Sequence, residues 1–327
     1  MTILTDKAQF TGHMVRIFVS RSQPAEQAPQ ALDGMKLIQL LAGMFVETAL
    51  LFDEPDKGLE AIYSHLASDL ACEPATGHLG DLALPPSYVI DRETEQGRSM
   101  ARRLFEDWLH CPQEFLDLSL FATQQMIVAM EEDGQPRAEI FRLLIECTNR
   151  CLAYEIAAQE LCDIMIEQKI GLEGWSLSES ISGLSAVAGR SLALSFSNAQ
   201  FSAFRGNDLP EHLDRVAYVM TQEAIRLGIP AGSDWRFGLA ANDQPSNAPY
   251  ELIAALEPAC REFFQIIGLH NLMDQSVACA KASGRMLAMA SGGERPEIEP
   301  VIAKPLAMAA MTETYRTVCR EYAIVSC

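Results

Sequence analysis

Apolar residues recur at spacings of three and four along residues 137–170, and no glycine or proline interrupts this stretch. This spacing places apolar side chains on one face of an α-helix, because an α-helix has about 3.6 residues per turn. At about 1.5 Å per residue such a helix would be roughly 50 Å long, as expected for the spine of a helical bundle. The apolar positions are Ile140, Leu143, Leu144, Cys147, Cys151, Tyr154, Ala158, Leu161 and Met165.

The same helical spacing continues over most of the chain from residue 33 onward, and turns rich in glycine and proline separate the segments. We therefore predict an all-α fold, a bundle of about nine to eleven helices around the helix at 137–170. No run of alternating strand-like residues is found after residue 30. The other predicted helices cover 34–52, 59–71, 92–110, 112–130, 210–227, 251–267, 271–291 and 300–325.

The first 30 residues differ from the rest and are predicted to form an N-terminal arm or linker. Val15–Val19 is a candidate strand, and the prolines at 24 and 29 are typical of a linker. Residues 31–327 are expected to form the helical domain, with a candidate subdivision near 171–177. Gly171 is expected to cap the long helix at this point.

Residues 176–202 are rich in serine, alanine and glycine. Small side chains let helices approach closely, so this segment is expected to form a tightly packed helix. The alternative is a mobile segment that lines a groove.

The chain carries a formal net charge of −19, and acidic residues outnumber basic ones in each third of it. A negative field spread in this way repels phosphate backbones and anionic lipid headgroups. We therefore expect neither a nucleic-acid partner nor a membrane surface. A protein partner with basic residues is compatible with this charge.

Nine cysteines, an odd number, and the lack of a recognisable signal peptide favour free thiols in the cytoplasm. The longest apolar stretch, Leu37–Phe52, contains Gln39 and Glu47. Because a bilayer span needs about 20 apolar residues, no transmembrane helix is expected.

No metal site is expected either. No histidine follows an acidic residue by three positions, and neither His-x-x-x-His nor Cys-x-x-Cys occurs. Cys147, Cys151 and Cys162 share a face of the long helix, where they are expected to serve as small core residues. A haem needs only one axial ligand, so a helical protein of this kind could hold one. The candidate ligands are His65, His110, Cys111 and His270.

Two segments resemble a nucleophile elbow, at residues 97–101 (Gly-Arg-Ser-Met-Ala) and 189–193 (Gly-Arg-Ser-Leu-Ala). That motif requires a strand before the serine, whereas both segments lie inside helical patterns. Residues 284–288 repeat the Gly-Arg step without the serine. We therefore interpret the three glycines as points where helices pack closely.

The best candidate for a binding site is the glycine-bounded loop at 232–238, within a long non-helical stretch. It combines an acidic, a basic and two aromatic residues, and aromatic residues and arginine are common anchors in binding sites. Alternatively, the aromatic residues pack the loop onto the bundle. The residues concerned are Asp234, Trp235, Arg236 and Phe237.

Two hypotheses for function follow from these observations. The first is a non-catalytic regulatory, adaptor or scaffold protein that binds another protein through an acidic or groove surface, since no catalytic signature is found. The second is an all-α enzyme or ligand carrier with a pocket between helices, which could hold an organic cofactor such as haem.

Overall fold

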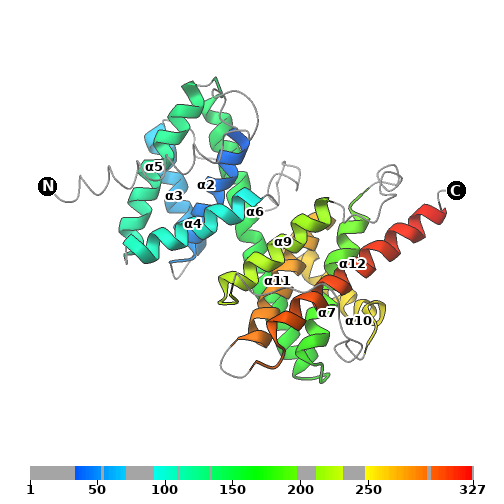
Figure 1. The fold of residues 1–327 in the computed structure, drawn as a ribbon. Helices are drawn as coiled ribbons and strands as arrows, with labels where there is room; N and C mark the ends of the chain where they lie inside the picture. The colour runs from blue at the N-terminus through cyan, green and yellow to red at the C-terminus, as the bar shows by residue number, and fades with distance from the viewer. Residues whose placement is uncertain are drawn as a thin grey trace. The chain divides into compact units, whose positions relative to one another are not determined.

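The computed structural model describes residues 34–52, 55–70, 92–108, 111–132, 134–196, 211–230, 247–292 and 296–325. This part of the chain contains ten α-helices, one π-helical segment and no β-strand (Figure 1). The predicted all-α bundle is therefore confirmed. The predicted arm with its candidate strand at Val15–Val19 lies outside the described residues.

The chain divides into two compact units, Met1–Leu152 and Ala153–Cys327. The boundary lies inside α6 (Arg137–Ile164), so that this helix contributes residues to both units. The subdivision near 171–177 stays a prediction. The first unit also contains α2 (Gly34–Ala49), α3 (Pro55–Leu70), α4 (Arg92–Trp108) and α5 (Pro112–Glu132). The second also contains η2 (Met165–Ile170), α7 (Leu177–Leu194), α9 (Glu211–Arg226), α10 (Pro249–Ile266), α11 (Leu272–Ser291) and α12 (Pro300–Val325).

The long helix predicted over 137–170 is confirmed, with its last six residues in a π-helical turn. The wider turn is closed by the N–H of Gly171, which donates to the carbonyl of Ile166 at 2.9 Å. Gly171 follows the helix as predicted, but its backbone stays right-handed. The left-handed conformation falls instead on Gly174, whose φ is 74°.

Two prolines belong to observed helices, one at the first position and one in the interior. The second helix begins at Pro55, four residues earlier than predicted. Proline is tolerated in the first turn of a helix because its missing N–H would have no partner there. Pro305 is buried and lies within α12, which continues past it to Val325.

Helix α2 forms the core of the first unit. Every residue from Leu37 to Ala49 is buried, so this helix is enclosed on all sides rather than on a single face. It packs against α3, α4 and α5. Its predominantly apolar sequence, which is untypical of a surface helix, therefore reflects burial on all sides.

Helix α7 has the same role in the second unit, where it packs against α10, α11 and α12 (Figure 1). All residues from Ser180 to Gly189 are buried. The Oγ atoms of Ser185 and Ser283 lie 2.7 Å apart, and the hydroxyl of Ser276 donates to the carbonyl of Ala188 at 2.8 Å. The expected tightly packed helix is thus confirmed for the described part of the serine-rich segment.

Two glycines set the crossing of α2 and α4. A Cβ atom on Gly97 would lie 2.0 Å from the carbonyl oxygen of Leu40, and one on Gly43 would lie 2.0 Å from that of Thr94. Real Cβ atoms do not approach a backbone oxygen so closely, because the atoms would overlap. Only glycine permits this contact.

The other two Gly-Arg steps also lie at helix crossings. A Cβ on Gly189 of α7 would lie 2.2 Å from the carbonyl oxygen of Met311 on α12. One on Gly284 of α11 would lie 2.4 Å from that of Met220 on α9. The interpretation of these glycines as packing positions is confirmed, and both elbow-like segments lie within continuous helices.

Within the described residues, no helix is both long and apolar enough to cross a membrane.

Candidate functional site

The loop that the sequence favours as a binding site lies outside the described residues. This holds for all four of its candidates, Asp234, Trp235, Arg236 and Phe237. Their role as a recognition loop stays a prediction, and the candidate surfaces below come from other parts of the chain.

The candidate haem ligands that the structure describes lie at its surface. His65, Cys111 and His270 are all exposed, and His110 lies outside the described residues. The described part of the chain contains no group of three or more histidine, cysteine or acidic residues placed to hold a metal ion. A haem ligated by one of these residues stays a prediction.

The three cysteines on the face of α6 are buried, as expected for core residues. Burial disfavours the thiolate and raises the pKa of Cys147 to about 12. The pKa of Cys162 is also raised to about 12 by burial, and its thiol donates to the carbonyl of Ala282 at 3.4 Å. Such thiols are weak nucleophiles and poor metal ligands at neutral pH.

The most highly charged interior cluster is a network between α6, α9 and α11 in the second unit. Glu155 and Glu223 are buried, with side chains 3% and 0% exposed. The Nζ atom of Lys281 lies 2.8 Å from Oε1 of Glu155. Arg285 joins the two carboxylates, because its Nη2 donates to Glu155 Oε2 at 2.7 Å and its Nε donates to Glu223 Oε1 at 2.8 Å.

The network is closed by Arg226, whose Nε donates to Oε2 of Glu223 at 2.8 Å. All four carboxylate oxygens of Glu155 and Glu223 thus face a positively charged donor. Close to this network, the hydroxyl of Tyr154 donates to Oδ1 of the buried Asp274 at 2.5 Å, which also connects α6 with α11. Groups paired in this way hold three helices in register. We therefore interpret this network as structural.

A smaller network of the same kind joins α2 and α4 in the first unit. Glu47, which is 7% exposed, accepts from Nε of Arg98 at 3.2 Å and from Nε of Arg102 at 3.0 Å. Arg98 directly follows Gly97, just as Arg285 directly follows Gly284. In these two cases the arginine after the crossing glycine therefore pairs with a carboxylate on the helix that the glycine contacts, whereas Arg190, which follows Gly189, pairs with Glu257 on α10.

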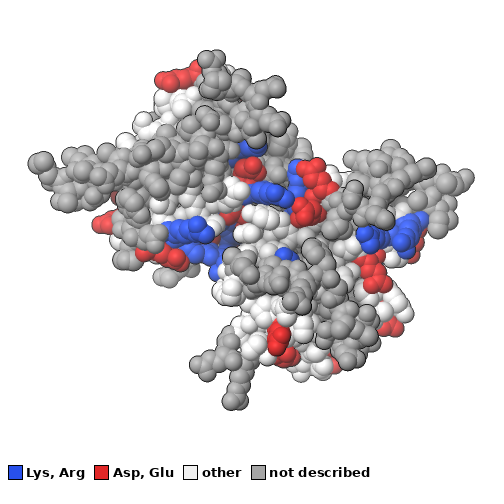
Figure 2. All heavy atoms as spheres, in the orientation of Figure 1, with Lys and Arg blue, Asp and Glu red and all other residues white. Residues whose placement is uncertain are grey.

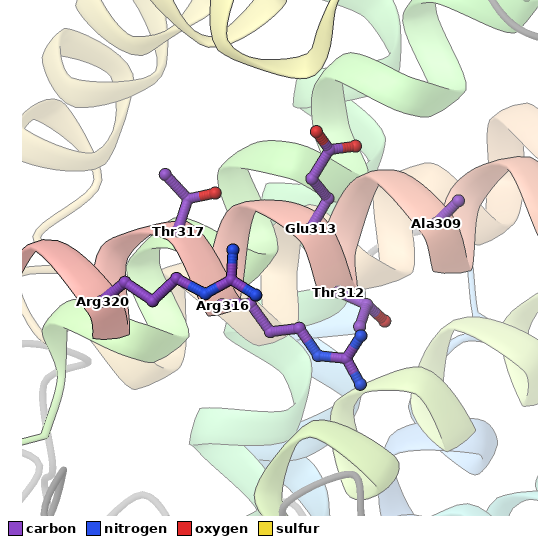
Figure 3. A pocket seen from close by; sticks show the side chains of 6 residues that line it. All are labelled: Ala309, Thr312, Glu313, Arg316, Thr317 and Arg320. Atoms are coloured by element: carbon purple, nitrogen blue, oxygen red, sulfur yellow. The ribbon is translucent and has the colours of Figure 1, made fainter. Parts of the chain in front are cut away.

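A hollow of about 320 Å³ lies along α12 in the second unit. Arg316 and Arg320 lie one helical turn apart beside it, and Figure 3 shows the side chain of Arg316 directed toward Thr312 and that of Glu313 directed away from both. The hollow is lined, among the described residues, by Ala309, Thr312, Glu313, Arg316, Thr317 and Arg320. The interhelical pocket of the second sequence hypothesis stays a prediction.

The outer face of α5 combines apolar and acidic side chains. Phe121 and Val128, two turns apart, are 42% and 38% exposed, and α5 contains no lysine or arginine. Seen down the helix, this face spans about 80°, because the spacings are multiples of three and four residues. We call it the α5 face. It consists of Glu114, Asp117, Phe121, Gln125, Val128 and Glu132, which are all exposed.

The α5 face differs in its charge pattern from other surfaces that the described residues form. In Figure 2 the described acidic and basic side chains of the face in view lie mostly in mixed groups. Several form surface ion pairs one helical turn apart, such as Arg142 with Glu146 and Arg261 with Glu257. Among the described residues, such an ion pair of α5 is found at its C-terminal end alone, where Glu131, which flanks the face, pairs with Arg137 at 2.5 Å.

The buried charge network and the α5 face were not predicted from the sequence, although the sequence contains a pattern that indicates each of them. Glu223 lies three and seven residues after Met220 and Val216, on the apolar face of its helix, where a carboxylate must find a buried partner. Phe121 and Val128 lie on the polar face of α5, where apolar residues are unexpected. Neither sequence pattern shows which other helix or partner contacts these residues.

Comparisons of the chain with protein-family models, with curated proteins and with solved structures give no significant match.

Proposed function

We propose that the protein is a non-catalytic helical adaptor or scaffold that binds a basic segment of another protein through the α5 face. The observation that carries this proposal is the pair of exposed apolar side chains, Phe121 and Val128, on a helix without any basic residue. Apolar anchors surrounded by charge are typical of surfaces that bind proteins.

The chemistry of the α5 face defines the partner. From Glu114 to Glu132 the face is roughly 27 Å long, at about 1.5 Å per residue, which is the length of a five-turn helix. A partner helix with two apolar residues one or two turns apart would cover Phe121 and Val128. Lysine or arginine residues at both ends of that helix would then face Glu114, Asp117 and Glu132.

The interior charges support a non-catalytic role. In the buried network between α6, α9 and α11, the carboxylates of Glu155 and Glu223 are saturated by cations of the same protein. A general acid or base must reach a substrate proton, and a group held by such contacts cannot do so without breaking them. These residues therefore contribute to helix packing.

The experiment compares proteins captured by the tagged full-length chain and by variants of the α5 face. Phe121→Ser/Val128→Ser removes the apolar anchors, and Glu114→Gln/Asp117→Asn/Glu132→Gln removes the flanking charges. We expect both variants to lose the same stoichiometric partner, and we expect the wild-type complex to weaken steeply with salt because its charges are exposed. A purified partner then gives the affinity by titration.

The matched control is Ile266→Ser on α10, which removes a more exposed apolar side chain, 77% exposed, from the other unit. It should retain the partner. If the α5 variants and the control capture the same proteins as the wild type, the α5 face is not the binding surface. If no stoichiometric partner is recovered at low or moderate salt, the adaptor hypothesis itself is contradicted.

A further inference from the structure

Arg316 and Arg320 differ from most described arginines in their surroundings. Both are exposed, and neither forms an ion pair with a carboxylate among the residues that the structure describes. Elsewhere in the described chain, arginines are typically paired, and most pairs are with a residue one turn away or on a packed helix. Arginines in such ion pairs are Arg98, Arg102, Arg137, Arg142, Arg190, Arg215, Arg226, Arg261 and Arg285.

The two guanidinium groups are placed to act together. Residues four apart on a helix lie on the same face, about 6 Å apart along its axis. Figure 3 shows both side chains extending along α12 in the same direction, with the guanidinium of Arg316 beside Thr312. Glu313, which precedes Arg316 by three residues on α12, is directed away from them (Figure 3). The hollow therefore has cationic and hydroxyl donors on the same side.

We propose that this hollow binds the phosphate group of a small organic phosphate through Arg316 and Arg320. A guanidinium presents a planar set of N–H donors that matches two phosphate oxygens, and two such groups balance the charge of a phosphate dianion. The hydroxyl of Thr312 supplies a further donor. This site goes beyond the proposed protein-binding function, because it lies in the other unit and uses other residues.

The size of the hollow indicates an organic ligand. Its volume of about 320 Å³ is at the lower end of the range of roughly 300–1,000 Å³ found for small-molecule sites. A free phosphate ion would leave most of this volume to water. The protein's net charge of −19 repels anions in general, so binding here depends on the two local arginines and weakens with salt.

The test is calorimetric titration of the full-length protein with glucose 6-phosphate, with inorganic phosphate, and with glucose as the uncharged comparison. We expect saturable binding of glucose 6-phosphate, weaker binding of inorganic phosphate and no binding of glucose. Arg316→Ala and Arg320→Ala should each weaken the binding about tenfold, since each removes charge-assisted hydrogen bonds. Both are surface substitutions, and circular dichroism verifies that the variants remain folded.

The matched control is Arg103→Ala on α4, which removes another exposed arginine that has no ion pair within the described residues. Its affinity for glucose 6-phosphate should equal that of the wild type. An equal loss in Arg103→Ala would show that the effect is one of net charge and would overturn the site. If neither glucose 6-phosphate nor inorganic phosphate binds saturably, the proposed site is also overturned. Equal affinities for these two compounds would contradict the proposal that the ligand is an organic phosphate.

Discussion

Gly97 on α4 lies so close to Leu40 on α2 that a Cβ atom at position 97 would stand 2.0 Å from the Leu40 carbonyl oxygen. The contact is between two backbones, so no side chain can rotate away to relieve it. The close approach also brings Arg98, the next residue, to the buried carboxylate of Glu47. Gly97 therefore contributes, together with Gly43, to the short distance between the helices and also places the ion pair across them.

Gly97→Ala should destabilise the protein by about 2 kcal/mol or more, because the added methyl group forces α2 and α4 apart. Urea unfolding followed by circular dichroism measures the change. The control is Gly58→Ala in α3, where the nearest atom to a new Cβ belongs to the side chain of Phe52 at 3.4 Å. This control should be neutral or stabilising by up to about 1 kcal/mol, since alanine favours the helix. Equal effects of the two substitutions would contradict the steric explanation.

Glu223→Gln should lower the free energy of unfolding by about 3 kcal/mol, because it leaves Glu155 as the one buried carboxylate of this network for Arg226, Lys281 and Arg285. The control is Glu257→Gln, which removes the partner of Arg190 and Arg261 at a site 30% exposed. Its effect should be at most about 1 kcal/mol, since water screens this pair. Urea unfolding of both variants at low and high salt checks the difference. A loss for Glu223→Gln no larger than that of the control would show that the network does not stabilise the fold.

Cys147 and Cys162 should resist alkylation in the native protein. Their pKa values of about 12 keep both thiols protonated at pH 8, and burial blocks the reagent. Brief treatment with N-ethylmaleimide followed by peptide mass spectrometry should show labelling of the exposed Cys111 and none of these two. In urea all three should react. Rapid labelling of Cys147 or Cys162 in the native state would contradict their burial.

The stability contributed by the Cys162 thiol should decrease at alkaline pH. Its pKa rises from 9.0 to about 12 on folding, so the folded state retains a proton that the unfolded state releases above pH 9. The contribution is fully present below pH 9 and is lost as the pH approaches 12, at about 1.4 kcal/mol per pH unit. The difference in unfolding free energy between wild type and Cys162→Ala should therefore shrink as the pH rises above 9. A difference that stays constant for Cys162→Ala between pH 8 and pH 11 would refute this linkage.

The helices could be predicted from the sequence because their signals are local. The helix predicted over 137–170 has the same first and last residues in the structure. Pro112 and Pro300 are the first residues of α5 and α12, and Gly292 directly follows the last residue of α11. Apolar spacing also identified the cysteines of α6 as core residues, and the three Gly-Arg steps as packing positions. Each of these inferences depends on residues within a few turns of one another.

The pairing of helix faces, in contrast, was decided by the tertiary structure alone. Periodicity shows which face of α6 is buried, but many other apolar faces in the chain could cover it. The contact between Glu155 and Arg285 joins residues 130 positions apart, and its partner Glu223 comes from a third helix. Whether a buried charge finds its counter-ion depends on how helices distant in sequence pack, and on the glycines that set the distance between them.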